Sequence, residues 1–262
     1  MKNHGETARK LWALEGGDIS EQRGVLVLGE SGPVVLPCPS FLVEHRRGLV
    51  LIDTGIAPAA VGDAHAAYGK FADELGISLR SEQCVDRQIE ALGYKVSDVT
   101  HVIMTHLHWD HTGGMHLFPH AQFFVMSGEL QYACWPLPAG PLYRREEIEA
   151  TRGFAWNQIE SEELDLFADG SIVMVHMPGH TPGNASVVVR LAGRTIVLAG
   201  DTAHLRSGLN HELPMPSDYN TLDSVKSIRR LRQLVRSLDA MLWLAHDPTD
   251  WSEYKHAPDF YE

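Results

Sequence analysis

The chain has 262 residues and a formal net charge of −12, with 44% apolar and 21% charged residues. This length allows a well-buried core, and the composition is that of an ordinary globular protein. The negative charge repels phosphate-rich partners, so nucleic acid is not expected as a partner, and a neutral or weakly charged small molecule fits better.

Short runs rich in β-branched and apolar residues recur along the chain and predict strands. No long linker or repeat separates them, so we expect a single domain over residues 1–262. The predicted strands cover residues 24–28, 40–44, 48–52, 100–104, 121–126, 172–175, 185–191, 194–199 and 241–245.

Helices are predicted between these strands. Ser81 can cap a helix that Gly93 ends, and a longer amphipathic helix begins near Asn220 and reaches Leu238. Its polar face carries arginines between positions 229 and 236, which we interpret as a solvated helix face. Strands interspersed with helices favour sheets covered by helices over a β-barrel.

The segment 128–156 differs from the rest because it is rich in proline, glycine and aromatic residues. One interpretation is an irregular loop that packs on its own aromatic side chains. The other is a lid or pocket wall over a site, because long irregular insertions in compact domains are often functional.

The cysteines and the N-terminus bear on location. Cys38, Cys84 and Cys134 are scattered and odd in number, which suits reduced thiols in a cytoplasm better than disulfides. No signal peptide is visible at the N-terminus. No apolar run approaches the ~18 residues of a membrane span, so no membrane partner is expected.

The strongest chemical signal is a cluster of metal-binding side chains that follows the predicted strand 100–104. His106, His108, Asp110 and His111 occur within six residues. Such polar groups are buried only with strong partners, and imidazole with carboxylate suits Zn²⁺ and related divalent cations. The pair at positions 113 and 114, both glycine, is expected to let the backbone turn tightly beneath the metals.

Three more candidate ligands lie just past predicted strands. His180 follows the strand 172–175, Asp201 follows 194–199, and His246 follows 241–245. Site residues gather at such strand ends in layered α/β folds. A carboxylate such as Asp201 can also bridge two cations with its two oxygens.

This pattern resembles the metallo-β-lactamase superfamily, and residues 53–55 (Asp-Thr-Gly) resemble a turn that supports the metal loop there. The resemblance implies an αββα sandwich of two mixed β-sheets flanked by helices. It also implies two divalent metal ions, with zinc expected and iron, cobalt or manganese as alternatives. The implied ligands are His106, His108 and His180 for the first metal, Asp110, His111 and His246 for the second, and Asp201 bridging both.

Within the superfamily, the chain is most similar to N-acyl homoserine lactonases, which degrade quorum-sensing signals. The compact length, the seven-ligand set and the aromatic-rich tail after His246 carry this similarity. Those lactonases often have a tyrosine three residues after the bridging aspartate, where this chain has His204. A neutral imidazole N–H can donate the same hydrogen bond.

The resemblance implies that a metal-bridging hydroxide opens the ester bond of a lactone ring. One metal and His204 would stabilise the oxyanion, and the second metal or a proton from Asp110 would help the alkoxide to leave. Five aromatic residues are candidate walls for an acyl chain, with core packing as the alternative for each: Trp109, Phe124, Trp135, Tyr143 and Trp156. Exposed aromatics near the tail allow a homodimer.

Several other functions are weighed against the lactonase. A glyoxalase II-type thioesterase has a nearly identical metal motif but needs a basic glutathione-binding cluster, for which only the arginines between 229 and 236 are candidates. Another small-lactone or ester hydrolase of the same fold is also open. A nuclease needs a basic cleft, and a secreted β-lactamase needs an export signal. A di-iron oxidoreductase typically has a Glu in place of His108. A non-catalytic relative would lack ligands, and none is missing.

Overall fold

The computed structural model describes residues 7–136 and 142–262. A six-stranded sheet has the order β1-β4-β5-β6-β7-β8. Its β1, β4 and β5 pair antiparallel, whereas β5 to β8 run parallel. These strands are β1 Lys10–Leu14, β4 Ser40–His45, β5 Gly48–Ile52, β6 Val99–Ile103, β7 Gln122–Met126 and β8 Ala155–Ile159.

A second, five-stranded sheet has the order β13-β12-β11-β10-β9. Its pairs are antiparallel except for the parallel pair of β12 and β13. The strands are β9 Glu163–Asp165, β10 Ile172–His176, β11 Ala185–Arg190, β12 Thr195–Leu198 and β13 Met241–Trp243. A separate antiparallel hairpin joins β2 Asp18–Gln22 to β3 Pro33–Pro37.

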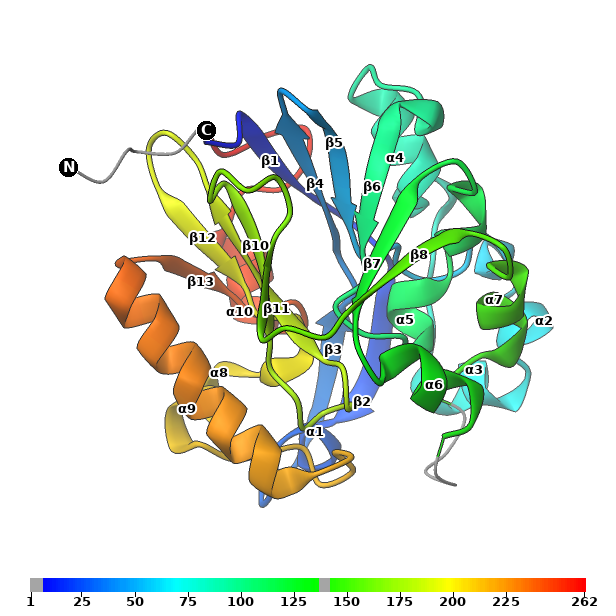
Figure 1. Cartoon of the computed structure of the whole chain (residues 1–262). Helices are drawn as coiled ribbons and strands as arrows, with labels where there is room; N and C mark the ends of the chain where they lie inside the picture. Colours follow the sequence, from blue (N-terminus) through cyan, green and yellow to red (C-terminus); the bar gives the residue numbers. More distant parts are fainter. Residues whose placement is uncertain (1–6, 137–141) are drawn as a thin grey trace.

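The two sheets face each other, and helices cover their outer sides (Figure 1). Between the sheets, Val43, Val50 and Ile103 of the first pack in one apolar cluster with Met174 and Val187 of the second. The helices are α1 Arg23–Leu26, α2 Ala64–Tyr68, α3 Lys70–Leu75, α4 Val85–Ala91, α5 Trp109–Thr112, α6 Glu129–Cys134, α7 Arg145–Ala150, α8 Arg206–His211, α9 Thr221–Leu238 and α10 Pro248–Glu253.

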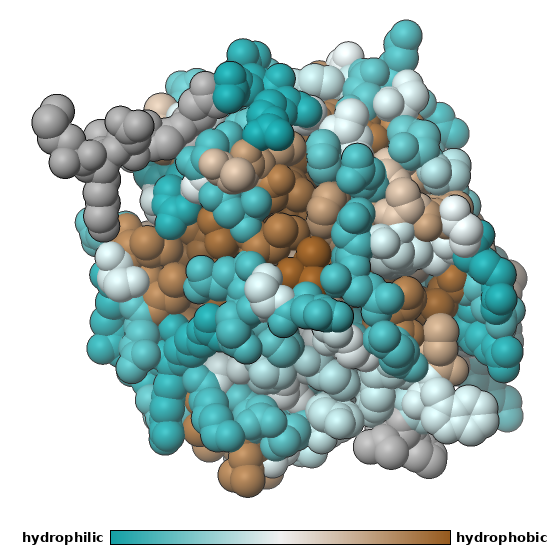
Figure 2. Space-filling model, viewed as in Figure 1, coloured by the Kyte–Doolittle hydropathy of each residue, from teal (hydrophilic) through white to brown (hydrophobic). Residues whose placement is uncertain are grey.

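The outer layers are held by apolar helix faces. Ile89 of α4 and Ile148 of α7 pack in a second cluster with residues of the first sheet, such as Leu51. Ile228 and Leu231 of α9 pack in another cluster against the second sheet. Each layer thus buries one apolar face, and the predicted αββα sandwich is confirmed. Figure 2, viewed from the same side as Figure 1, shows apolar residues as a band across the middle of the molecule, between polar margins.

Eight of the nine predicted strands are present, with ends shifted by at most a few residues. The strand predicted at residues 24–28 is wrong, because this segment forms the helical turn α1. It lies between the paired strands β2 and β3, where Leu26 and Val27 are buried in an apolar cluster. A short apolar run suits one helical turn as well as a strand, so its pattern did not discriminate.

The helix predictions hold in outline. Asn220 accepts hydrogen bonds from the backbone N–H groups of Leu222 and Asp223 at the start of α9, as a capping residue does. Ser81 does not cap α4, because a 3₁₀ turn over Ser81–Gln83 intervenes and Cys84 takes the N-cap position. Gly93 follows that helix with φ +89°, in the left-handed region that glycine favours.

The segment 128–156 is not an irregular loop throughout, because it contains α6, α7 and the first residues of β8. Its residues 137–141 lie outside the described part of the chain. No helix among the described residues is long and apolar enough to cross a bilayer. The three cysteines are free, with Cys38 and Cys84 buried and Cys134 exposed.

Candidate metal centre

The candidate ligands meet at one end of the two sheets, on loops that follow their strands. His106 and His108 follow β6, and the short helix α5 then presents Asp110 and His111. The other three follow strands of the second sheet: His180 after β10, Asp201 after β12 and His246 after β13. All seven side chains are buried.

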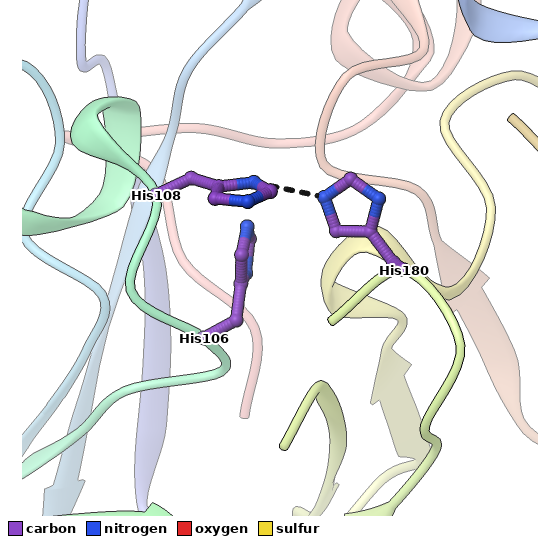
Figure 3. A group of neighbouring side chains, drawn as sticks. All are labelled: His106, His108 and His180. Carbon is purple, nitrogen blue, oxygen red and sulfur yellow. Dashed lines mark hydrogen bonds between the residues drawn. The ribbon is translucent and has the colours of Figure 1, made fainter. Parts of the chain in front are cut away.

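One group of donors surrounds the first candidate metal position. His106, His108 and His180 offer ring nitrogens that lie within 4.8 Å of one another, and Figure 3 shows the three rings converging from two loops. The Nδ1 of His108 is 3.0 Å from Nε2 of His180. The Oδ2 of Asp201 is 3.5 Å from Nε2 of His180 and 3.7 Å from Nε2 of His106.

A second group lies on the other side of Asp201. The Oδ1 of Asp201 is 3.5 Å from Nε2 of His111 and 3.3 Å from Nε2 of His246. The Oδ2 of Asp110 is 3.6 Å and 3.5 Å from the same two nitrogens. The two carboxylate oxygens of Asp201 therefore face different donor groups, Oδ2 the first and Oδ1 the second.

These separations fit two bound divalent cations. Donor atoms at Zn–N and Zn–O bond lengths in a tetrahedral arrangement are about 3.3 Å apart. Among the described residues, Nε2 of His106, Nε2 of His111 and Oδ1 of Asp201 are buried without a hydrogen-bond partner. Buried polar atoms normally have partners, so atoms left unpaired and facing one another suit a cation between them.

The remaining nitrogens of three ligand histidines donate hydrogen bonds. His111 Nδ1 is 2.9 Å from Oδ2 of Asp53, and Asp53 also accepts from the backbone and hydroxyl of Thr105. His180 Nδ1 is 2.9 Å from Oδ1 of Asp218. His246 Nδ1 is 2.8 Å from the carbonyl oxygen of Pro37. Such partners fix the ring orientation and the tautomer that leaves Nε2 free to bind metal.

Asp53 stands where the Asp-Thr-Gly motif predicts support for the metal loop, and it adopts φ +56° there. Nothing in the sequence near Asp218 indicates that its loop reaches His180, so this partner was not predicted. Cys38 was not predicted at the site either, and its Sγ lies within 4.8 Å of donor atoms of Asp110 and His246. Burial raises the pKa of the Cys38 thiol to about 12.

The charge balance of the site is set by burial and by its carboxylates. Burial lowers the pKa of His106 and His108 well below the ordinary value, and neighbouring histidines lower it further. Burial would also lower the pKa of His111 and His246, but the carboxylates around them raise it well above the ordinary value. Burial would raise the pKa of Asp201, yet the histidines around it hold the pKa well below its usual range.

A cavity of about 300 Å³ opens over the donor groups. His108, Asp110, His180, Asp201 and His246 contribute to its lining, together with His204. The walls are mainly apolar and come from the β2–β3 hairpin, α3 and two loops, with two glutamates also lining the cavity: Ile19, Val25, Leu26, Leu36, Phe71, Leu75, Leu142, Met215, Glu21 and Glu74.

His204 lies beside the metal donors. Its Nε2 is 3.1 Å from Oδ2 of Asp201, and its ring stacks on that of His246 with centroids 5.6 Å apart. Burial lowers the pKa of His204, so its ring is neutral near pH 7 and carries one N–H. A neutral hydrogen-bond donor thus stands in the cavity wall next to the metal positions.

Of the five aromatic residues predicted to form the acyl wall, Trp109 lines the cavity. Phe124 and Trp156 do not line it; they pack in the core, Trp156 against Phe123 with centroids 4.9 Å apart. Phe124 lies on β7 and Trp156 on β8, the edge strand of the first sheet, and both are partly buried against apolar clusters. Trp135 is 87% exposed at the end of α6 and is outside the cavity lining.

Tyr143 also lies outside the cavity lining, although it is close to the metal centre. Its ring is 4.7 Å from the ring of His108, and its hydroxyl donates to Glu129 at 3.1 Å. It therefore contacts the back of a ligand loop rather than the space for substrate.

The glycine pair after His111 serves a different purpose from the predicted one. Gly113 has φ −58° and Gly114 φ −96°, which other residues adopt easily, so no special turn requires glycine. A Cβ on Gly113 would instead come within 2.0 Å of the backbone nitrogen of Ala57. Glycine is needed here because two backbone segments touch.

The arginines of α9 do not form a basic cluster beside the cavity. Arg229 and Arg232 pair with Glu212 at 2.6 Å, and Arg230 pairs with Glu162 at 2.7 Å. These arginines are absent from the cavity lining. The candidate glutathione-binding cluster of a thioesterase is this arginine face of α9, and Arg229, Arg230 and Arg232 on it are thus engaged in ion pairs.

Comparisons with known proteins agree with this geometry. Residues 33–246 match the model of the metallo-beta-lactamase superfamily. The chain is 35% identical over 242 residues to the N-acyl homoserine lactonase AttM of Rhizobium radiobacter, an alignment that covers 89% of this chain and 90% of that protein.

Solved structures share the fold. A structure of an N-acyl homoserine lactone hydrolase with the product N-hexanoyl-L-homoserine bound at its catalytic metal centre has a TM-score of 0.86 at 22% identity, covering 98% of this chain and 100% of the other. A variant of AiiA from B. thuringiensis, with N-decanoyl-L-homoserine bound at its active site, has a TM-score of 0.87 at 22% identity and the same coverage.

Proposed function

Because this chain belongs to the metallo-β-lactamase superfamily, we propose that it is a dinuclear-metal hydrolase that opens the ester bond of a lactone ring, with N-acyl-L-homoserine lactone as the substrate. The observation that carries the proposal is the cluster of seven buried histidine and aspartate side chains, five of which line a cavity with mainly apolar walls. The 35% identity to a lactonase over most of both chains supports the lactone over other esters.

We assign His106, His108 and His180 to the first metal, Asp110, His111 and His246 to the second, and Asp201 to both. When bound, the cations supply Lewis acidity and lower the pKa of a coordinated water to about 7. The protein orients them through rigid donors, since Asp53, Asp218 and Pro37 each hold one histidine ring.

His204 is the proposed oxyanion donor. Nε2 of His204 is 3.1 Å from Oδ2 of Asp201, the oxygen that also faces His106 and His180. We assign the His204 N–H to the carbonyl oxygen of the substrate for the state in which a cation would occupy that oxygen. A fixed donor aimed at a developing negative charge stabilises the transition state more than the ground state. Asp110 also lines the cavity, and we assign it the transfer of a proton from the attacking water to the leaving alkoxide.

The apolar wall formed by Ile19, Leu26 and Phe71 accommodates the acyl chain in this proposal. Such a wall gains about 25 cal/mol for each Å² of apolar surface removed from water. Trp109 borders the cavity, but it is buried and packs edge-on against Tyr68 and Phe71, so it supports the wall from behind.

The proposal is tested by incubating the metal-reconstituted protein with N-acyl homoserine lactones and following acid release with a pH indicator. We expect one proton per turnover with Zn²⁺, Co²⁺ or Mn²⁺, and loss of activity once a chelator has removed the metal. Inactivity on every lactone, together with hydrolysis of S-lactoylglutathione, would replace the lactonase by the glyoxalase II-type thioesterase.

Replacing His204 tests its role separately. We expect His204→Ala to lower kcat/KM for the lactone by ~10²–10³, the usual cost of one oxyanion donor. His204→Tyr should recover part of this loss, because a phenol O–H can donate the same bond. His211→Ala, an exposed histidine on α8, is the control and should change little. Unchanged kcat/KM in His204→Ala with two metals bound would rule out the oxyanion role.

Four further points stay predictions. Zinc is expected because three imidazoles and a carboxylate suit it, yet metal availability also decides occupancy. The cytoplasmic location agrees with three free cysteines. The homodimer and the single domain over residues 1–262 are expected from the sequence, and sedimentation and limited proteolysis of the purified protein would test them.

A further inference from the structure

A fully buried carboxylate lies directly behind the first metal position. Glu129 is the first residue of α6 and has no exposed surface. Its Oε1 accepts hydrogen bonds from the backbone N–H of Leu107 at 2.9 Å and from the hydroxyl of Tyr143 at 3.1 Å. Its Oε2 accepts from the backbone N–H of Gly183 at 2.9 Å. A buried carboxylate is tolerated only with such donors.

The two backbone donors belong to the two ligand loops of the first metal position. Leu107 stands between His106 and His108, whereas Gly183 is three residues after His180. The first loop follows β6 of one sheet, and the second follows β10 of the other. Glu129 therefore connects loops that the two sheets present separately.

Glu129 packs closely against Gly183 on one side and contacts Tyr143 on the other. A Cβ on Gly183 would lie only 2.4 Å from Cβ of Glu129, so glycine is required for this approach. Tyr143, the third donor, places its ring 4.7 Å from the ring of His108. Glu129 thus binds the backbone of both ligand loops. Through Tyr143 it also supports the outer side of the His108 imidazole.

We propose that Glu129 is a positioning residue that sets the distance between the His108 and His180 rings, now 3.0 Å between Nδ1 and Nε2, and thereby the affinity of the first metal site. It acts through two backbone segments and does not touch substrate. This inference depends on the metal centre of the proposed function and not on the identity of the substrate. Failure of the lactone assay would therefore leave it intact.

The chemistry requires a carboxylate. Each of the two oxygens faces a different backbone N–H, so both oxygens must accept. In Glu129→Gln one oxygen becomes an NH₂ group, which cannot accept and would face a backbone N–H. An unpaired buried donor is unfavourable, and this penalty is relieved when the two loops separate.

The decisive measurement is Co²⁺ binding to full-length Glu129→Gln, by stoichiometry, chelator competition and the visible spectrum. We expect the first-site affinity to fall roughly 10–100-fold, as for loss of other outer partners of metal ligands, with the second site kept. The spectrum should then resemble that of His180→Ala, which lacks a first-site donor. It should differ from that of His246→Ala, which lacks a second-site donor.

Asp250→Asn is the matched control for a purely structural role. Asp250 is also a buried carboxylate, and it accepts from the backbone N–H of Leu244 at 2.8 Å and from Arg206. We expect this variant to unfold at a lower temperature while the first-site Co²⁺ affinity is unchanged. Wild-type affinity at both sites in Glu129→Gln, or an equal loss at both sites, would overturn the positioning role.

Tyr143→Phe decides the question if Glu129→Gln does not fold. It removes one donor to Glu129 and leaves the two backbone bonds in place. We expect a smaller loss of Co²⁺ affinity with the same preference for the first site. Unchanged binding at the first site would overturn the proposal.

Discussion

Asp201→Asn is expected to release at least one of the two metal ions and to lower kcat/KM by more than 10³-fold. Asp201 faces each donor group with one oxygen, at 3.3–3.7 Å from the nitrogens of four histidines. The substitution removes a negative charge and replaces one carboxylate oxygen by an NH₂ group, which cannot bind a cation. Both metal positions therefore lose a donor or its charge.

Metal content by elemental analysis and chelator competition measures this effect. Asp218→Asn is the graded control, because Asp218 holds His180 from outside at 2.9 Å and is not itself a donor in either group. Loss of such an outer partner typically costs 10–100-fold in metal affinity or activity. If Asp201→Asn kept two metals at wild-type affinity, the bridging assignment would be wrong.

Gly113→Ala is expected to destabilise the fold by about 3 kcal/mol or more, at the upper end of the range for overpacked sites. The added Cβ would meet the backbone nitrogen of Ala57 at 2.0 Å and the backbone carbon of Ile56 at 2.5 Å. Backbone atoms cannot move aside as a flexible side chain can. The strain would push α5 away from the loop after β5, where Thr54 N–H donates to the carbonyl of His111 at 2.8 Å.

The free energy of unfolding in urea measures this cost. Gly153→Ala is the control, because Gly153 has open space around its Cβ position but a φ of +92°. Its expected cost is about 1–2 kcal/mol, from backbone conformation alone. The two variants together separate the contact from the conformation. A loss in Gly113→Ala no larger than that in Gly153→Ala would contradict the expected cost and show that the backbone contact of Gly113 is largely relieved.

The metal chemistry was predictable from sequence because four donors are close neighbours along the chain. His106, His108, Asp110 and His111 lie on one loop and one helical turn, so their proximity in space follows from their spacing. The strands that carry the other ligands were also predictable, since β10, β12 and β13 are short, buried apolar runs. The sandwich architecture itself came from the resemblance and was not visible in the periodicity.

The sequence was least informative where a side chain could serve either the core or the cavity. Phe124 and Trp156 are aromatic and could wall a pocket, yet both pack against apolar clusters of the core. The cavity wall instead includes Ile19 and Leu26 of the β2–β3 region. An aromatic residue in a strand packs equally well on either side. Only the neighbours decide which side it faces, and they are distant in sequence.

Histidine and carboxylate donors suited to a divalent metal could be recognised in the chain alone, because residue type and local spacing are chemical properties of the sequence. Three contacts became visible in the folded chain: each oxygen of Asp201 faces its own donor group, Asp218 holds His180, and Glu129 joins the loops of the two sheets. The physical reason is that these contacts depend on how the two sheets pack. The distance of 2.9 Å between Glu129 and Gly183, which are 54 positions apart, is set by that packing and by no local pattern.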